Sequence, residues 1–598
     1  MGDLVLLSPG LHVDRCEMID IRIRQAEVPW RFLKSNAVIA AAIALLVALI
    51  TQSWAGLNTA DSEFYATLSF FGSDVTDRAI APAYFLTRLT TIAPLYLLTQ
   101  IFGPWIAFTI WRFMLLLIVS YSVMRLGNKW SLSSWQSAGL TLFISLNSAI
   151  LFSLADPYPA GTTVALIFAI LSLSLTLVPK ARLAGVVQGL VLSLLVIAIV
   201  ANNLYAGLIA VATVISVLLA RKIISFNSRL FYLAIGLLLG FVAGYLIVEL
   251  VSNLMFPRED WLGTVRLYTS ALNQSDYTSD AWFIFKDPSM IFPMSILALS
   301  IVRLVASKCK VLVPLALSGT PIAVAFIATY VSQGPFLEFS YYQILIWPGA
   351  MLSLFLMSAP MIRKVPINLA TIFISLVALC LMIVVGHTAF DFSFLAILVL
   401  ISLTAICFAI LNIDIEKPVL NGSMGRLLGL IVVGALFISG QIAQNSREAY
   451  RPSETIHYSN AFSANPVENM VRSSYQAETW ILERTSSSDR IMTWVEMDPQ
   501  DRDFGMLSMA SFQLAGPNSL SNNSQPDVQD LERLETIRPS VIALYGESLE
   551  SLLAYYGDLN ASFKSPAPEC SEFPWPNSTV KTAWVCLVRP MDFNGSNS

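Results

Sequence analysis

The run AVIAAAIALLVALI, residues 37–50, and the acidic stretch NTADSEFY that follows it at residues 58–65 decide the fold of this chain. An uninterrupted apolar run of this kind is suited to the hydrocarbon interior of a bilayer. Comparable apolar runs recur until residue 443. The 598-residue sequence is 56% hydrophobic and 13% charged, whereas a soluble domain is about 25% charged. These properties predict a polytopic α-helical membrane protein and argue against a soluble enzyme or a disordered chain.

Thirteen apolar runs are long enough to be transmembrane helices. They lie near residues 37–53, 105–124, 135–153, 159–178, 183–201, 204–220, 230–250, 288–305, 311–331, 341–360, 367–386, 392–412 and 427–443. The stretch 83–101 is also apolar, but Arg88 and Pro94 within it favour a helix that lies along the membrane interface.

The distribution of basic residues predicts the orientation of these helices. With 83–101 at the interface, the N-terminal segment 1–36 and the loops on its side hold 19 Lys and Arg residues, whereas the opposite loops hold 5. Because cytoplasmic loops collect positive charge, we expect a multi-pass protein of the plasma (inner) membrane with a cytoplasmic N-terminus. The predicted domains are the segment 1–36, a transmembrane domain 37–443 with a large first outer loop at 54–104, and an extracytoplasmic domain 444–598.

The C-terminal region differs in composition from the rest of the chain. From Gln444 onward it has 20 acidic and 11 basic residues, a net charge of −9, whereas the preceding part carries +5. Its patterns predict a small α/β domain. The expected helices are 467–483 and 548–556, and the expected strands are 490–495, 540–545 and 582–588. Cys570 and Cys586 are its only cysteines, and outside the cytoplasm they are expected to form a disulfide worth about 3 kcal/mol.

The first outer loop contains the strongest candidates for chemistry. Asp61 and Glu63 are followed by Tyr65 and later by Arg88. Carboxylates near the headgroups, beside a cation, suit a site where a lipid-borne substrate is deprotonated or bound. The alternative for Asp61 is a helix N-cap, with Glu63 in the first turn favouring the helix dipole.

Asp156, in the sequence SLADPY at residues 153–158, is a second acidic candidate between two predicted spans. Asp followed by Pro is also typical of a helix start, with Asp156 as N-cap and Pro157 as the first helical residue. A divalent metal ion needs at least two converging oxygen ligands. Asp61 and Asp156 could supply them, whereas the three histidines are too scattered for a zinc motif.

Other charged residues lie in places where a membrane protein binds polar groups. The loop 251–287 mixes Arg258 and Arg266 with Trp, Tyr and acidic residues, a composition that suits sugar or lipid-phosphate binding and equally suits interfacial anchoring. His387 falls at the outer end of a predicted span, where an interfacial role is the alternative to substrate binding. Arg112 lies inside a span, so we expect it to face the bundle interior and pair with an acid.

Residues 1–180 resemble the GT-C superfamily of integral-membrane glycosyltransferases, in the branch of the protein mannosyltransferases and aminoarabinose transferases. The resemblance rests on Asp61 and Glu63 followed by Tyr65 at the start of a large first outer loop, on PAYFLTR at residues 82–88, on Phe102-Gly103, and on Arg112. The expected thirteen spans followed by an outer C-terminal domain are similar to that group as well. In this chain Ser62 separates the two acids.

The resemblance implies an enzyme that transfers a sugar, with inversion, from a polyprenyl-phosphate donor to a glycan, lipid or protein acceptor. Asp61 would be the general base, and the leaving phosphate would need a cation. The implied catalytic residues are Asp61, Glu63 and Asp156, and the implied substrate-binding residues are Tyr65, Arg88, Arg258, Arg266 and His387. No cofactor is implied with certainty, and a divalent metal ion at Asp61 and Asp156 stays open. The expected partners include the lipid bilayer and no nucleic acid.

A flippase or exporter of lipid-linked sugars is the main alternative, because such a carrier would also have many spans and buried charges. Transporters commonly contain internal repeats with broken helices at matching places, and no such repeat is visible in this sequence. A glycan polymerase or ligase is also multi-spanning, but it would be expected to have its large loop late in the chain.

Overall fold

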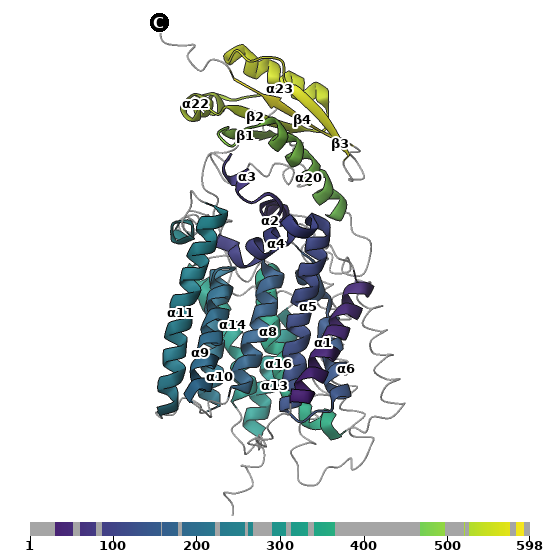
Figure 1. Ribbon diagram of the computed structural model, residues 1–598, viewed down its shortest axis with the longest axis vertical. Coiled ribbons are helices and arrows are strands. Elements are labelled where there is room, and N and C mark those ends of the chain that lie inside the picture. The colour runs from purple at the N-terminus through teal and green to yellow at the C-terminus, as the bar shows by residue number, and fades with distance from the viewer. Residues whose placement is uncertain are drawn as a thin grey trace, which may run out of the picture.

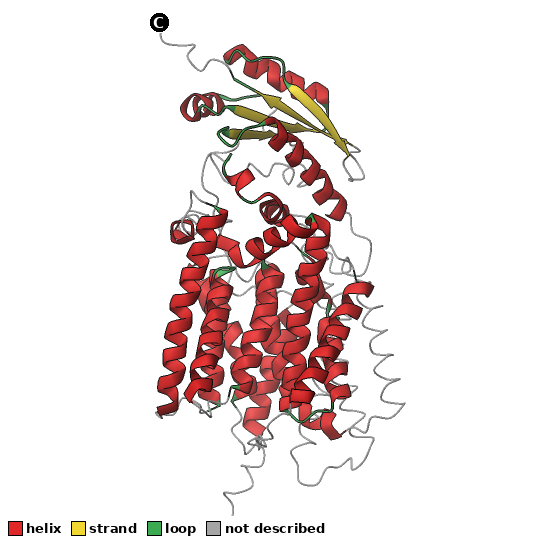
Figure 2. Cartoon of the chain, in the orientation of Figure 1, coloured by secondary structure: helices red, strands yellow, loops and turns green. Residues whose placement is uncertain are grey.

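The computed structural model describes the main part of the helical region and most of the C-terminal region. The described residues are 30–51, 60–78, 87–156, 158–177, 182–221, 228–256, 261–266, 290–306, 312–332, 340–364, 467–496, 520, 525–574 and 582–590. They form a bundle of helices with a small α/β unit at one end (Figures 1 and 2). Every structural statement below concerns these residues.

The bundle is built from apolar helices. They are α1 (Trp30–Ile50), α5 (Pro104–Lys129), α6 (Ser134–Ser145), α7 (Ser148–Ala155), α8 (Ala160–Thr176), α9 (Arg182–Val200), α10 (Leu204–Ala220), α11 (Ser228–Met255), α13 (Ile291–Ala306), α14 (Val313–Ser332), and α15 (Ser340–Gln343) with η5 (Ile344–Ile346) leading into α16 (Trp347–Lys364). Among the described helices, four are long and apolar enough to cross a membrane, or five if the bent pair α6–α7 is one span. The predicted spans from residue 367 onward lie outside the described residues, so the number thirteen stays a prediction.

The predicted span 135–153 consists of two helices bent by 68° instead of one straight helix. Each of the two helices has its own N-cap, and the second N-cap lies at the break. Ser133 starts α6 with a capping box, in which its hydroxyl accepts from the Gln136 N–H. Asn147 starts α7, because its side chain accepts a hydrogen bond from the Ile150 N–H at 3.3 Å. An N-cap residue has non-helical backbone angles, so the chain cannot run through Asn147 as a continuous helix.

Helices α9 and α11 pack with their backbones unusually close. A Cβ atom built on Gly236 of α11 would lie 2.1 Å from the Val186 carbonyl oxygen of α9, and one built on Gly189 of α9 would lie 2.3 Å from the Leu233 carbonyl oxygen. Small residues at a helix interface permit such an approach within a membrane. The exposed side of α11 is apolar, with Phe231, Leu238, Phe241, Leu246 and Leu254 among its exposed residues.

Three helices of the first loop lie at one end of the bundle, beneath the α/β unit (Figure 1): α2 (Ala60–Phe71), α3 (Ser73–Thr76) and α4 (Leu89–Phe102). Helix α4 lies across this end. Its first turn contacts the end of α9 through a 2.8 Å hydrogen bond from the Thr90 hydroxyl to the Ala198 carbonyl. At its other end Gly103, with φ 75°, turns the chain directly into α5. The stretch thus forms a 14-residue helix with Pro94 inside it, and its place along the membrane interface stays a prediction.

The C-terminal unit is a four-stranded sheet with helices on both faces. Its elements are α20 (Val467–Arg484), β1 (Ile491–Val495), α22 (Val528–Ile537), β2 (Val541–Gly546), α23 (Leu549–Ser562), β3 (Glu569–Pro574) and β4 (Thr582–Val588). The strand order is β1-β2-β4-β3, with β1 parallel to β2 and the other pairs antiparallel. All five predicted elements of this region are confirmed, whereas α22 and β3 were not predicted.

Alternate residues of β2 enter different cores, as expected for a strand covered on both faces. Ala543 and Tyr545 belong to the core on the α20 side, which is continuous with the core of the bundle. Ile542 and Leu544 belong to a separate core with α22 and α23. Glu478 of α20 is fully buried, and its carboxylate lies near the Tyr545 hydroxyl. Burial and this carboxylate both raise the pKa of Tyr545. Helix α20 therefore connects the sheet to the bundle.

Cys570 and Cys586 form a disulfide in the structure, with their Cα atoms 4.1 Å apart. They lie directly opposite one another in the antiparallel register of β3 and β4. The bond therefore crosses between two neighbouring strands. It attaches the edge strand β3, whose backbone has a partner on one side only, to the interior of the sheet.

Candidate functional site

A buried arginine and a buried tyrosine meet at the α4 end of the bundle. Arg88, at the N-cap position of α4, is 2% exposed, and Tyr65 of α2 is 1% exposed. The Arg88 Nε–H donates to the Tyr65 hydroxyl at 3.4 Å. A guanidinium this deeply buried is costly unless anionic or polar groups surround it. The structure thus brings together two residues that the sequence predicted to bind substrate.

Tyr158 links this pair to Asp156. The ring of Tyr158 meets the ring of Tyr65 edge to face, with centroids 5.4 Å apart. Asp156 accepts a hydrogen bond from the Tyr158 N–H at 2.9 Å. Helix α7 ends before Asp156 and α8 begins at Ala160, so the suggested N-cap role of Asp156 is wrong. Its carboxylate instead stabilises a local turn by accepting from the N–H two residues later in the chain, a contact that is common for Asp.

A network of hydrogen bonds below the cluster fixes the backbone positions of its residues. The Thr91 hydroxyl, in the first turn of α4, contacts the Asn202 carbonyl oxygen Oδ1 at 2.7 Å. The Asn202 Nδ2 donates to the Pro159 carbonyl at 2.7 Å. Thr91 is three residues after Arg88, and Pro159 directly follows Tyr158. Because Asn202 contacts both segments, it sets the spacing between Arg88 and Tyr158.

Asp61 and Glu63 belong to α2, the helix that contains Tyr65. Since α2 begins at Ala60, Asp61 lies inside the first turn and is not its N-cap. Positions 61 and 65 are four residues apart, so they share a face of the helix, whereas position 63 lies on a different face. The side chains of Asp61 and Glu63 lie outside the described part of the structure.

Of the three remaining predicted residues, the structure describes Arg266 alone. Arg258 and His387 lie outside the described residues. Arg266 is exposed at the end of the helical segment 261–266. Within the described residues, no group of three or more His, Cys, Asp or Glu side chains could hold a metal ion. A metal ion that uses Asp61 stays a prediction, because the Asp61 side chain is not described.

Arg112 is buried inside the bundle, as predicted. Contrary to the prediction, no acidic side chain in the described part of the chain pairs with Arg112. Among the described residues, the guanidinium donates to the hydroxyl and to the carbonyl oxygen of Thr51. The Thr51 hydroxyl in turn donates to the Val47 carbonyl at 2.6 Å. These contacts connect α5 to the end of α1, which is a structural role.

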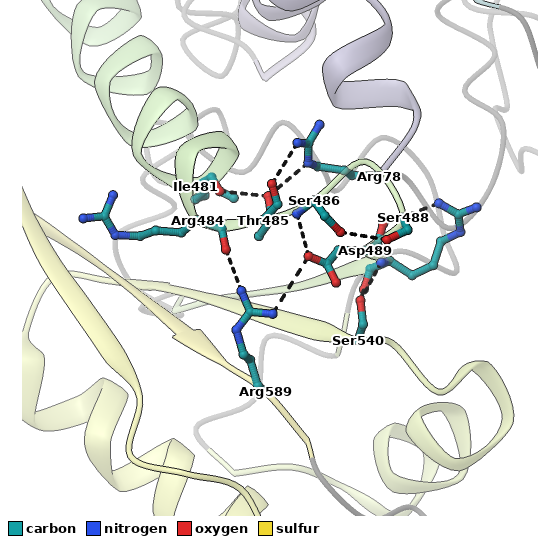
Figure 3. A network of polar contacts seen from close by, with 10 residues as sticks. Arg78, Ile481, Arg484, Thr485, Ser486, Ser488, Asp489, Ser540 and Arg589 are labelled. Carbon is teal, nitrogen blue, oxygen red and sulfur yellow. Dashed lines mark hydrogen bonds and ion pairs between the residues drawn. The ribbon is translucent and has the colours of Figure 1, made fainter.

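A second polar cluster joins the first loop to the C-terminal unit (Figure 3). We call it the Arg78 network, and its members are Arg78, Thr485, Ser486, Asp489, Arg490, Ser540 and Arg589. Arg78 donates from Nε to the Thr485 hydroxyl at 3.0 Å and from Nη2 to the Thr485 carbonyl at 2.9 Å. Thr485 directly follows α20. No local sequence pattern indicates that Arg78 has a partner 407 positions away.

The backbone and the charges of the network reinforce this contact. The Ile491 N–H of β1 donates to the Arg78 carbonyl at 3.0 Å. Partial burial alone would raise the pKa of Asp489, but hydrogen bonds from Ser486 and Ser540 and the charge of Arg589 hold that pKa below its ordinary value. Burial lowers the pKa of Arg78, and nearby carboxylates oppose that shift. An arginine nevertheless stays charged at neutral pH.

An aromatic cluster lies beside the Arg78 network, between α2, α5 and α20. Tyr475 of α20 stacks on Phe71 with centroids 5.1 Å apart, and its ring meets Phe70 and Trp105 edge-on at 5.8 and 6.0 Å. The guanidinium of Arg472 lies 4.0 Å above the Trp105 ring, an arrangement that favours a cation–π interaction. The last two residues of α2 are therefore packed against the C-terminal unit.

Together these features define the class of the molecule: a polytopic helical membrane protein with a buried polar cluster at one end, beneath an α/β unit. No protein-family model and no curated protein matches the sequence. Among solved structures, ArnT from Cupriavidus metallidurans bound to undecaprenyl phosphate matches with a TM-score of 0.44 and 13% identity, covering 96% of this chain and 100% of that chain.

The same ArnT in the apo state matches with a TM-score of 0.43 and 14% identity, covering 92% of this chain and 97% of that chain. Both matches are to ArnT, at low identity and over most of this chain. Fold similarity at this level does not establish an activity, so the function is argued from the site itself.

Proposed function

We propose that this chain is a GT-C-like membrane glycosyltransferase that uses a polyprenyl-phosphate-linked sugar. The observation that carries the proposal is the buried cluster of Arg88, Tyr65 and Tyr158, in which Tyr65 lies on α2, the helix that also contains Asp61. A buried cation suits the phosphate of such a donor, and aromatic faces suit the apolar side of a sugar ring. The site lies at the start of α4, at the end of the bundle.

In the proposed reaction Asp61 acts as general base on an acceptor hydroxyl. The hydroxyl oxygen forms a bond to the anomeric carbon, and its proton passes to the Asp61 carboxylate. The bond between the anomeric carbon and the phosphate oxygen breaks at the same centre, which inverts its configuration. Arg88 stabilises the negative charge that develops on the departing polyprenyl phosphate. The acceptor, whether glycan, lipid or protein, is set by surfaces beyond this cluster.

The other predicted residues have supporting roles in this proposal. The Tyr65 hydroxyl accepts from Arg88 and so orients the guanidinium. Asp156 acts on the backbone of Tyr158, so we assign it to positioning that ring. Glu63, Arg258, Arg266 and His387 stay candidates on the strength of the sequence alone, as does a divalent metal ion at Asp61.

The test is the transfer of radiolabelled sugar from a panel of undecaprenyl-phosphate-linked sugars by the purified protein in nanodiscs. We expect Asp61→Asn to lower the transfer rate by about 10²- to 10⁴-fold, the usual contribution of a general base, while donor binding is retained. Glu532→Gln, the same charge change on the exposed face of α22, is the matched control. Wild-type activity in Asp61→Asn would contradict the proposed base.

One described feature favours the alternative of a lipid-linked sugar carrier. The 68° bend between α6 and α7 is of the kind found in transporters, whose substrate sites use discontinuous helices. Here, however, Asn147 at the bend already caps α7. Flipping of a fluorescent lipid-linked sugar in liposomes by the wild-type protein, with no transfer from any donor, would favour the carrier.

A further inference from the structure

The contact between the first loop and the C-terminal unit has a consequence for the site. We infer that Arg78 is a positioning residue: through Thr485 it holds α2, the helix of Tyr65 and Asp61, in its place above α4. The link to catalysis rests on the proposed function, whereas the positioning of α2 itself does not. The inference stands on the contacts of Arg78, on the packing at the end of α2, and on the geometry of the Arg88–Tyr65 pair.

Arg78 makes a set of hydrogen bonds that a lysine cannot reproduce. Its Nε and Nη2 atoms donate to the two oxygens of Thr485, and its Nη1 donates to the Asp74 carbonyl within its own loop. The planar guanidinium thus connects the α3 turn to the end of α20 in one fixed orientation. Because Arg78 is 7% exposed, water competes little for these bonds, and their loss would leave buried polar groups without partners.

The end of α2 is fixed on two sides. On one side, Phe70 and Phe71 pack against Tyr475 of α20. On the other side, Gly72 adopts φ 55°, and a Cβ atom at this position would lie 2.7 Å from the Tyr96 ring of α4. Only glycine fits this turn without strain. The chain between α2 and Arg78 therefore has little freedom, so a shift at Arg78 is passed to α2.

The Arg88–Tyr65 pair is sensitive to such a shift. Arg88 is held on α4, where Thr91 contacts Asn202, whereas Tyr65 moves with α2. The donor–acceptor distance of 3.4 Å is already at the long end for a hydrogen bond, so a small displacement of α2 breaks it. Misplacement of a reacting group by about 1 Å can lower a rate by about 10²-fold.

The experiment measures the position of α2 and catalysis separately. Hydrogen–deuterium exchange of the α2 amides reports how firmly the helix is held in place. Steady-state transfer kinetics report kcat and KM. In Arg78→Ala we expect faster exchange of the α2 amides and a kcat about 10- to 100-fold lower, with KM for the donor nearly unchanged. Arg78→Lys should behave like Arg78→Ala. Thr485→Ser keeps both acceptor oxygens and should behave like the wild type.

Arg533→Ala, which removes an exposed arginine from α22, is the matched control and should leave both measurements unchanged. If Arg78→Ala fails to fold, Thr485→Val is used in place of that variant, because it removes only the hydroxyl that accepts from the Arg78 Nε. Unchanged α2 exchange in the variant would overturn the inference, as would faster α2 exchange with a wild-type kcat. If the wild type transfers no sugar from any donor, the proposed function fails, and the α2 exchange alone decides whether Arg78 positions the helix.

Discussion

At the scale of single residues, their contacts distinguish three arginines of the bundle. Arg88 hydrogen-bonds Tyr65, whose ring in turn packs against Tyr158. Arg112 is equally buried but contacts Thr51 of the neighbouring helix end. Arg221 donates to the Ser174 and Leu177 carbonyls at the end of α8, which stabilises that helix terminus. Of these three, Arg88 is the one that we propose to act on a substrate.

The corresponding prediction concerns donor binding. Arg88→Ala should weaken the affinity for undecaprenyl phosphate by about 10- to 100-fold, because a hydrogen bond to a charged group is worth about 1.5–3 kcal/mol. Arg88→Lys should recover part of this loss, since lysine supplies the charge but not the forked geometry. Calorimetric titration of the lipid phosphate into the purified protein measures the difference. An unchanged affinity in Arg88→Ala would remove it from the phosphate role.

At the scale of elements, the sequence predicted the helices and strands that a local apolar or alternating pattern marks. The apolar runs indicated the helices, and the extended run 582–588 matches β4 to the residue. Strand β3 was missed because ECSEFP is a polar, largely exposed edge strand, stabilised by its partner β4. Helix α22 had a usable signal, since Asp527 and Asp530 form a capping box at its start. The break at Asn147 was missed because the apolar pattern continues across it.

The packing of α9 against α11 gives a prediction at the same scale. Gly236→Ala should lower the melting temperature, because the added Cβ atom would lie 2.1 Å from the Val186 carbonyl oxygen and overpacking typically costs about 1–3 kcal/mol. Gly139→Ala on α6 is the matched control, since a Cβ atom there meets nothing within 4 Å and the helix should gain slightly. Scanning fluorimetry in detergent measures both. Equal melting temperatures for the two variants would refute this account.

At the scale of the whole molecule, contacts between distant segments determine the site. Tyr65, Arg88 and Asp156 could be selected from the sequence because polar residues are conspicuous at the ends of apolar runs. That Tyr158 joins them, and that Asn202 spaces them, could not be predicted, because neither contact leaves a periodic pattern. The Arg78 network is the extreme case, since it connects the first loop to the last strands. Only the tertiary structure brings those segments together.

Acid should weaken the Arg78 network. The pKa of Asp489 is held below its ordinary value of 3.8, so its stabilising contribution is present at neutral pH. That contribution is lost as the pH falls below 3.8 and through the depressed pKa. We expect the α2 amides to exchange faster at pH 3, after correction for intrinsic exchange rates. The free energy that protects them should fall by at most about 1 kcal/mol, because water screens the Asp489–Arg589 pair. In Asp489→Asn the pH dependence should disappear, and its persistence there would assign it to another group.

Arg78 and Thr485 are 407 positions apart, so their contact can form only late in the synthesis of the chain. A ribosome adds about 5–20 residues per second, so the first loop waits roughly 20–80 s for its counterpart to be synthesised. Throughout that interval the helix of the proposed base has its neighbours in the bundle but not its support from α20. An incomplete chain would therefore lack this support, and the proposed site would be complete only after α20 and Thr485 have been synthesised.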